Sequence, residues 1–247
     1  MRIEYGKVSL LGHRKDNQDK VSVVVMDNAA MLLTFDGMGG HSDGARAAEV
    51  AMAKVDELFR ATPQPIFDPQ GFLYTALGRA HDAVVADGES VHVDDRPRAT
   101  CAVCLIQDKA AYWAHVGDSR VYLLRNGVVR ERTRDHSHVE VLLQEGVIGE
   151  HEVASHPMRN YVESCLGGDA ALPGITVSRK KNLKTGDVLI ACTDGLWSGL
   201  SDKQIAKLAN RPDVPILESL KEMAELAVEA NSPYSDNTTV ATLRWLG

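Results

Sequence analysis

One stretch decides how this sequence is organised, and it reads Leu32-Leu33-Thr34-Phe35-Asp36-Gly37-Met38-Gly39-Gly40-His41. The apolar run from Ala29 to Phe35 predicts a buried β-strand of ordinary length. The predicted strand ends at the carboxylate of Asp36, and glycines follow that let the backbone turn tightly and approach a ligand closely. Mg²⁺ and Mn²⁺ prefer such oxygen ligands. Taken alone, however, Asp-Gly after a strand is commonly only a turn.

A second copy of the pattern occurs far downstream, and it makes a cation site a stronger interpretation. Val188 to Cys192 is again an apolar strand candidate, and Thr193-Asp194-Gly195 follows it. Two carboxylates that lie close together repel each other unless a cation lies between them. An aspartate cluster without His or Cys favours Mg²⁺ or Mn²⁺ over zinc. Aspartate recurs at strand boundaries in five polar segments, 14–19, 36–40, 117–120, 193–195 and 235–238.

Length and composition set outer bounds. The chain has 247 residues, of which 44% are hydrophobic, so it can bury a substantial core. No Pro-, Gly- or Ser-rich linker divides it, and we predict a single domain over residues 1–247. The net charge of -7 without a basic cluster argues against nucleic acid as a partner. Neither a signal peptide nor a membrane span of roughly 18 apolar residues is predicted, so we expect a cytoplasmic protein.

Four cysteines in this length do not indicate a disulfide scaffold. Cys101 and Cys104 have the C-x-x-C spacing, but they fall within a strand-like run. Residues three apart on a strand point to opposite faces of the sheet, so these two thiols cannot share a metal ion. We expect both to be core thiols of a cytosolic protein.

The predicted elements come in blocks and not as a repeated strand–helix unit. Such blocks indicate an α+β fold in which helices pack outside antiparallel sheets. The sequence gives clear local signals for a helix start at Asp68-Pro69 and for a hairpin at Asn126-Gly127. The predicted strands span 5–11, 20–26, 29–35, 99–106, 110–116, 121–124, 128–132, 175–178, 187–192 and 238–245. The predicted helices span 44–60, 69–87, 201–209 and 215–230, with a short one around 139–143.

In their order and residue identities, these polar segments resemble motifs of the metal-dependent protein phosphatase family, of the protein phosphatase 2C type. The resemblance is in particular to the bacterial single-domain serine/threonine phosphatases of that family. The resemblance covers almost the whole chain. It implies a four-layer sandwich of two antiparallel β-sheets flanked by pairs of antiparallel helices, which agrees with the predicted elements. The segments that carry it are 14–19, 36–41, 116–120, 135–137, 156–160, 166–167, 193–197 and 236–240.

Carried over by motif, the resemblance implies a core site for two Mn²⁺ or Mg²⁺ ions. Asp36 would bridge the two ions, and the Gly37 carbonyl would hold one of them. Asp194 and Asp236 would complete the protein ligands of the second ion. A water that bridges two cations loses a proton near neutral pH and attacks phosphorus in line. No phosphoenzyme is then needed.

The resemblance implies further residues around this core site. Asp19 would lie in an outer shell and orient metal-bound water. Asp118 would form a third, weaker metal site together with Asp194. Arg14 would bind the substrate phosphate through its two-pronged guanidinium, a geometry that lysine cannot copy.

Two positions depart from related animal enzymes. Met38 stands where many of them have a histidine that is a candidate general acid, so the proton donor must be another residue or metal-bound water. Gln18 stands where they often have Glu, so it can orient water but adds no charge. His41, just past the glycines, is either a rim contact for substrate or a helix-entry residue.

We therefore predict an enzyme that hydrolyses phosphoserine and phosphothreonine on proteins and reverses a cognate Ser/Thr kinase. We expect a monomer, with a flap at about 137–168 that influences substrate choice. Two other functions stay open. One is a catalytically weak, phosphoprotein-binding pseudophosphatase, although the acid set is present. The other is a small-molecule phosphatase, which would need a closed pocket instead of an open groove.

Two alternative sites are weaker interpretations of the same sequence. Asp135-His136-Ser137 contains the residue types of a hydrolase triad, but triad members meet in space and not as sequence neighbours. His136, His138, His151 and His156 could be read as a zinc cluster. Their spacing is irregular, and we expect solvated surface histidines instead.

Overall fold

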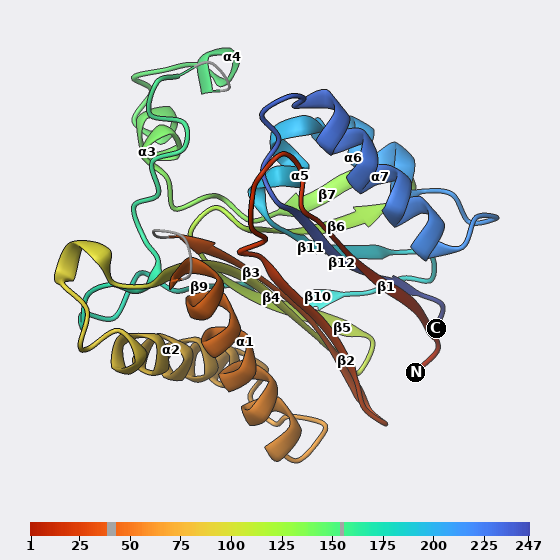
Figure 1. Cartoon of the computed structure of the whole chain (residues 1–247). Helices are drawn as coiled ribbons and strands as arrows, with labels where there is room; N and C mark the ends of the chain where they lie inside the picture. Colours follow the sequence, from red (N-terminus) through yellow and green to blue (C-terminus); the bar gives the residue numbers. More distant parts are fainter. Residues whose placement is uncertain (39–42, 154–155) are drawn as a thin grey trace.

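The computed structural model describes residues 1–38, 43–153 and 156–247, and it contains two antiparallel β-sheets packed face to face (Figure 1). The first sheet contains β1 (Ile3–Leu10), β6 (Arg120–Arg125), β7 (Val128–Arg132), β11 (Val188–Cys192) and β12 (Thr238–Trp245). The second contains β2 (Lys20–Val25), β3 (Ala29–Met38), β4 (Arg98–Gln107), β5 (Ala110–Val116), β8 (Leu166–Gly167), β9 (Thr176–Val177) and β10 (Lys181–Asn182). The five-stranded sheet has the order β1-β12-β11-β6-β7. The seven-stranded sheet has the order β10-β5-β4-β3-β2, with β8 beside β4 and β9 beside β5.

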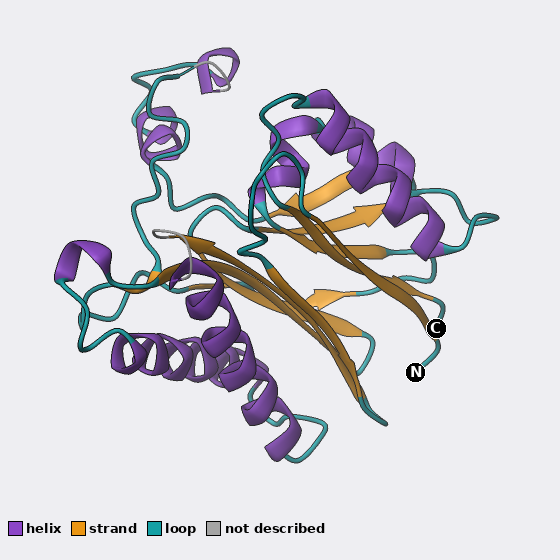
Figure 2. Ribbon diagram, viewed as in Figure 1, coloured by secondary structure: helices purple, strands orange, loops and turns teal. Residues whose placement is uncertain are grey.

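Helices cover the outer face of each sheet (Figure 2). They are α1 (Asp43–Ala61), α2 (Pro69–Asp87), α3 (His138–Gln144), α4 (Glu150–Val153), α5 (Asp194–Gly199), α6 (Asp202–Ala209) and α7 (Ile216–Ala230). Helices α1 and α2 pack on the seven-stranded sheet, and α5, α6 and α7 pack on the five-stranded one. Helices α3 and α4 stand away from both sheets (Figure 1). The predicted four-layer α+β sandwich is confirmed, with the short α5 added to one helix pair.

Three apolar layers hold this sandwich together, and β3 shows why its sequence is a continuous apolar run. Met31, Leu33 and Phe35 pack toward α1 and α2, whereas Ala30 and Leu32 pack toward the other sheet. Because both faces of the strand are covered, its side chains from Ala29 to Phe35 are apolar except Thr34, whose buried hydroxyl donates to the Ala102 carbonyl at 3.2 Å. A third apolar layer lies between the five-stranded sheet and its helices.

The same alternation confirms the prediction for the cysteines. Cys101 packs in the layer beneath α1 and α2, and Cys104 packs between the two sheets. Both thiols are buried and free, and burial raises the pKa of Cys101 to about 12. They are core residues that lie on opposite faces of β4.

Local signals placed several elements well and others less well. Helix α2 and strand β12 have the predicted bounds, and Asp68 caps α2 by accepting from the Gly71 N–H at 3.0 Å. The prediction that the central strand ends at Phe35 was wrong. Strand β3 continues to Met38 because β4 begins at Arg98 and supplies pairing partners. Only two residues of the predicted strand 175–178 are paired as β9, and the short α5, β8 and β10 were not predicted.

No helix within the three described ranges is both long enough and apolar enough to cross a membrane.

Candidate active site

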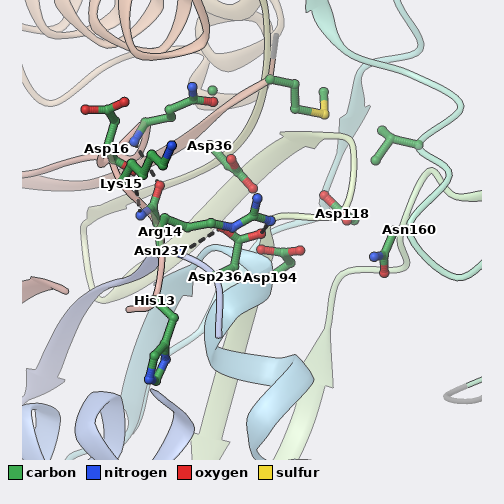
Figure 3. A pocket seen from close by; sticks show the side chains of 14 residues that line it. His13, Arg14, Lys15, Asp16, Asp36, Asp118, Asn160, Asp194, Asp236 and Asn237 are labelled. Carbon is green, nitrogen blue, oxygen red and sulfur yellow. Dashed lines mark hydrogen bonds and ion pairs between the residues drawn. The ribbon is translucent and has the colours of Figure 1, made fainter. Parts of the chain in front are cut away.

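Four aspartates from separate parts of the chain line one cavity of about 610 Å³. Asp36 lies in β3, and Asp118 lies in the connection from β5 to β6. Asp194 is the first residue of α5, and Asp236 precedes β12. Figure 3 shows the four carboxylates facing one another across the cavity. The structure therefore brings together the four carboxylates that the sequence predicted as metal ligands.

Two glycines let the backbone segments that carry these acids approach closely. A side chain on Gly37 would place its Cβ 2.0 Å from the carbonyl oxygen of Gly44, at the start of α1. A side chain on Gly195 would place its Cβ 2.1 Å from the carbonyl oxygen of Asn237. No residue other than glycine fits such contacts with backbone atoms. The Asp-Gly pairs seen in the sequence are therefore sites of close packing.

The carboxylates destabilise one another's charged forms. Burial, followed by the charges of neighbouring aspartates, raises the pKa of Asp36 and of Asp194 well above the ordinary range. Burial and the charge of Asp135 raise the pKa of Asp118 to about 7. Within the described part of the chain, Asp194 Oδ1 is buried and has no hydrogen-bond partner. A cation among these oxygens would relieve both the repulsion and the unsatisfied atom.

The donor set fits a hard divalent cation. The cavity lining offers the carboxylates of the four aspartates and the backbone of Gly37, all oxygen ligands of the kind that Mg²⁺ and Mn²⁺ take. His13 also lines the cavity, but its ring bonds the Ser235 hydroxyl at 2.7 Å. No three His, Cys, Asp or Glu side chains in residues 1–38, 43–153 and 156–247 already form a closed ligand group.

Arg14 brings a cation to the mouth of this cavity. Its Nη2 lies 2.5 Å from Asp236 Oδ2, and 59% of its side chain is exposed. The exposed residues Lys15 and Asp16 line the same rim. The guanidinium thus reaches the acid cluster while it stays accessible from solvent.

Asn237 holds the loop that carries Arg14, and the sequence interpretation did not assign it a role. Its Nδ2 donates to the carbonyl oxygens of Leu11 at 2.8 Å and Asp16 at 3.1 Å. Its Oδ1 accepts from the Gln18 N–H at 2.9 Å. The signal was present in the segment 235–238, where Asn follows Asp236 directly. A buried amide can satisfy several backbone groups of a loop at once.

Asp19 lies behind the cavity and not in its lining. It is buried, and the Thr193 hydroxyl donates to its Oδ2 at 2.8 Å. Burial raises its pKa to about 6, partly offset by hydrogen bonds from threonines. Gln18 does line the cavity, and its carbonyl oxygen accepts from the Gly37 N–H at 3.3 Å. His41 lies outside the described residues.

The segment 137–168 contributes two cavity-lining residues that the sequence did not predict, Asn160 and Val162. Asn160 belongs to the segment 156–160 that carried the family resemblance, so its sequence context was the available signal. Met38, predicted to replace a histidine, also lines the cavity. It cannot donate a proton.

The two weaker interpretations receive no support from the contacts. Asp135 binds Arg120 through both oxygens, at 2.8 and 2.6 Å, instead of orienting His136. Ser137 Oγ is buried with no partner among the described residues, so the three residues form no triad. His136 Nε2 bonds Thr176 at 2.9 Å, whereas His138 Nδ1 bonds Glu163 at 2.9 Å. These two histidines thus face different partners.

A known protein family matches most of this chain. The family model described as protein phosphatase 2C matches residues 11–241. The chain belongs to the protein phosphatase 2C family.

Three bacterial phosphatases or phosphatase structures show how similar this phosphatase 2C chain is to known proteins. It is 32% identical to the Mycobacterium tuberculosis serine/threonine protein phosphatase PstP over 92% of its own length. It spans only 42% of that relative. A Streptococcus agalactiae serine/threonine phosphatase structure matches with a TM-score of 0.89 at 26% identity, over 100% of both chains. The PstP catalytic domain in complex with two manganese ions matches with a TM-score of 0.81 at 29% identity, over 99% of both chains.

Proposed function

We propose that this protein is a metal-dependent phosphatase that hydrolyses phosphoserine and phosphothreonine on proteins. The observation that carries the proposal is the convergence of four carboxylates in one cavity with an arginine at its mouth. Family membership and the manganese complex of a related catalytic domain support it.

We assign the cation ligands to residues as the sequence predicted. Asp36, Asp194 and Asp236, with the Gly37 carbonyl, would hold two Mn²⁺ or Mg²⁺ ions. Asp118 and Asp194 would hold a third, weaker one. When bound, such ions supply an activated water and offset charge that develops on the transferred phosphoryl group.

The chain's own groups position the phosphate. Arg14 is the exposed cation beside the ligand set, and its planar fork matches two phosphate oxygens. The Asp236 contact orients the guanidinium toward the cavity. Asn237 fixes the loop from Leu11 to Gln18, so Arg14 approaches the phosphate from a rigid support. Asp19 and Gln18 would orient water around the ions.

The open rim favours a protein substrate over a small molecule. His13, Arg14, Lys15 and Asp16 are exposed along one side of the cavity. A side chain presented by a polypeptide can enter such a mouth, whereas small-molecule pockets usually enclose most of their ligand. A pseudophosphatase would need a defect in the acid set, and none of the four carboxylates is missing. We further propose a cytoplasmic monomer that opposes a cognate Ser/Thr kinase.

The test is hydrolysis of a phosphothreonine peptide by the purified protein. We expect activity with Mn²⁺, loss of activity with EDTA, and recovery with Mn²⁺ more readily than with Zn²⁺. Asp36→Asn and Asp236→Asn should each lower kcat by several orders of magnitude and leave the fold intact. Full activity in the metal-free protein would exclude the mechanism, and an active Asp36→Asn variant would exclude its bridging role.

A further inference from the structure

The connection that carries Asp118 is fixed by side chains from other parts of the chain. It runs from the seven-stranded sheet to the five-stranded sheet over residues 117–119. The Gly117 N–H donates to His136 Nδ1 at 3.2 Å, and the Gly117 carbonyl accepts from the His136 N–H at 2.9 Å. Ser119 Oγ and Thr100 Oγ1 lie 2.7 Å apart and share a hydrogen bond. Neighbouring groups therefore hold both ends of this short loop.

Trp197 holds the middle of the loop. Its indole Nε1–H donates to the backbone carbonyl of Asp118 at 3.0 Å. Trp197 lies three residues after Asp194 in α5, and residues three apart are neighbours on a helix surface. The helix that presents one cavity carboxylate thus also holds the backbone of the next.

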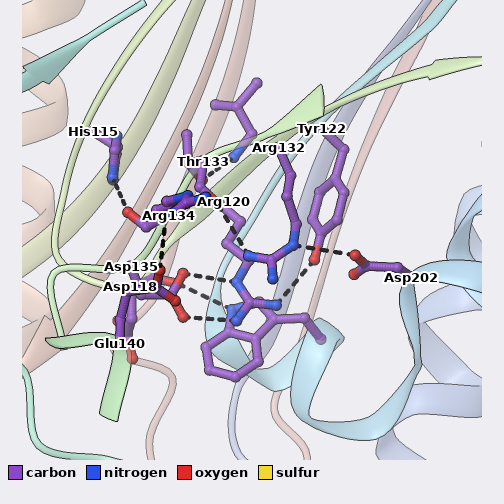
Figure 4. A network of polar contacts seen from close by, with 12 residues as sticks. His115, Asp118, Arg120, Tyr122, Arg132, Thr133, Arg134, Asp135, Glu140 and Asp202 are labelled. Atoms are coloured by element: carbon purple, nitrogen blue, oxygen red, sulfur yellow. Dashed lines mark hydrogen bonds and ion pairs between the residues drawn. The ribbon is translucent and has the colours of Figure 1, made fainter. Parts of the chain in front are cut away.

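Arg120 fixes the indole ring in turn. Its guanidinium carbon lies 3.7 Å from the ring centroid of Trp197, within the range of a cation–π contact. It also makes the two-pronged contact with Asp135 and donates to the Tyr122 hydroxyl at 3.2 Å (Figure 4). The Arg120 and Asp135 side chains are only 11% and 7% exposed. The guanidinium is thus held by Asp135 and Tyr122 and lies against the indole ring, so the ring has little freedom to move.

A second arginine–aspartate ion pair on the same strand allows a role in positioning the Asp118 loop to be distinguished from a role in stabilising the fold. Arg120 begins β6, and Arg125 ends it. Arg125 makes a two-pronged contact with buried Asp187, at 2.7 and 2.6 Å. Each pair gives a carboxylate with little or no exposure its opposite charge, so breaking either pair should destabilise the fold. Only the Arg120 pair is in contact with the residue that holds the Asp118 loop.

We infer that Trp197 and Arg120 are positioning residues for the dephosphorylation reaction and act by fixing Asp118 relative to Asp194. This inference rests on the proposed function. Neither side chain lines the cavity, so neither touches the substrate. Their effect must pass through Asp118, and that requirement makes the inference testable.

The first test is a double-mutant cycle between Trp197→Phe and Asp118→Asn. Phenylalanine keeps an aromatic face under Arg120 but loses the Nε1–H donor. We expect Trp197→Phe to lower kcat on a phosphothreonine peptide about 10-fold or more, with KM little changed. In the Asp118→Asn background the same change should alter kcat less than about twofold, because coupled residues are not additive. All four proteins of the cycle are measured on the same phosphothreonine peptide.

Trp113→Phe is the matched control. This tryptophan is buried, Lys181 Nζ lies 5.5 Å from its ring centroid, and its backbone N–H donates to the Ser178 hydroxyl. We expect its kcat to equal that of the wild type. An unchanged kcat for Trp197→Phe, or an equal loss in both backgrounds, would overturn the inference.

The second test does not depend on residual activity and compares Arg120→Lys with Arg125→Lys. Lysine keeps the charge but loses the two-pronged geometry. We expect both variants to melt at similarly lowered temperatures and only Arg120→Lys to lower kcat. Equal kcat values would refute the positioning role while the active wild type upheld the proposed function. An inactive wild type in Mn²⁺ would instead refute the proposed function.

Discussion

At the scale of the residue, Arg14 has two structural features whose consequences can be separated by experiment. It contacts Asp236, and most of its side chain is exposed to solvent, where the proposed function places the phosphate. The contact with Asp236 orients the side chain, whereas the exposure leaves donors available for substrate. Binding and chemistry should therefore respond differently when Arg14 is changed.

We expect Arg14→Ala to lower kcat/KM by about 30- to 150-fold, because a charge-assisted two-pronged contact contributes roughly 2–3 kcal/mol. The measurement is steady-state kinetics on a phosphothreonine peptide, with inorganic phosphate as inhibitor. Inhibition should weaken in parallel. Lys15→Ala, the neighbouring cation on the same rim, is the control and should change both constants less. An unchanged phosphate inhibition constant in Arg14→Ala would refute phosphate binding by Arg14.

His115 should make the folded state sensitive to acid. It is buried, its Nε2 donates to the Arg134 carbonyl at 2.7 Å, and its Nδ1 has no partner among the described residues. Burial, then the neighbouring His136 ring, lowers its pKa to about 4. Because the unfolded state binds the proton more readily, stability is complete above pH 6.5 and falls as the pH drops toward 4. The difference between the two pKa values corresponds to about 3 kcal/mol.

The measurement is urea unfolding of wild type and His115→Gln between pH 7 and pH 4 in the same buffer. We expect the wild type to lose more stability than the variant over this range. His92→Gln, which changes an exposed histidine, should keep the wild-type slope. Parallel slopes for wild type and His115→Gln would contradict the assignment.

At the scale of the element, α5 shows what local sequence could and could not predict. Strand β11 and the Thr-Asp-Gly that follows it were predicted from the sequence. The helix that begins at Asp194 was not, because six residues give too short an apolar pattern to detect. Strand β3 was likewise predicted only to Phe35, because pairing with β4 decides where it ends. Long periodic helices such as α2 carry their own signals, including the Asp68 cap.

The candidate site likewise contains some residues that the sequence could predict and others that it could not. Four aspartates and Arg14 could be predicted because they recur in strand-end motifs that resemble a known family. Val162 could not be predicted, and for Asn237 the segment 235–238 gave the position but not the role, since both roles depend on which loops the sandwich places side by side. Asn237 contacts the Leu11 carbonyl, which is more than 200 residues away in the sequence, and no local sequence pattern indicates such a contact.

Gly195 should tolerate no side chain. The Cβ of Gly195→Ala would meet the Asn237 carbonyl at 2.1 Å and the Thr238 hydroxyl at 2.7 Å. Because backbone must move, we expect a loss of about 1–3 kcal/mol in the free energy of unfolding, together with reduced activity. Gly78→Ala in α2 is the control, since its Cβ would meet only Leu172 at 3.7 Å. It should gain up to about 1 kcal/mol, as alanine does in helices. Equal stability for both variants in denaturant titrations would show that Gly195 is not constrained.

At the scale of the whole molecule, the proposed function implies that the four carboxylates couple ion binding to folding. Only the folded chain brings Asp36, Asp118, Asp194 and Asp236 together. An ion that binds the folded state alone stabilises it by about 2.7 kcal/mol at 100 times its Kd. In a chain of this length, that shifts Tm by roughly 5–10 °C.

The measurement is thermal melting in EDTA and in increasing Mn²⁺. We expect Tm to rise with Mn²⁺ in the wild type and to rise much less in the Asp36→Asn, Asp236→Asn double variant. The same rise in both proteins would place the bound ions elsewhere.

The four carboxylates of the cavity come from both sheets of the sandwich. Asp36 belongs to the seven-stranded sheet, Asp194 and Asp236 flank strands of the five-stranded sheet, and Asp118 lies on the crossing between them. The layer between the sheets is apolar, and the hydrophobic effect that favours its burial has no direction. Under the proposed function, bound cations would add directed contacts that join both sheets at one edge of the sandwich.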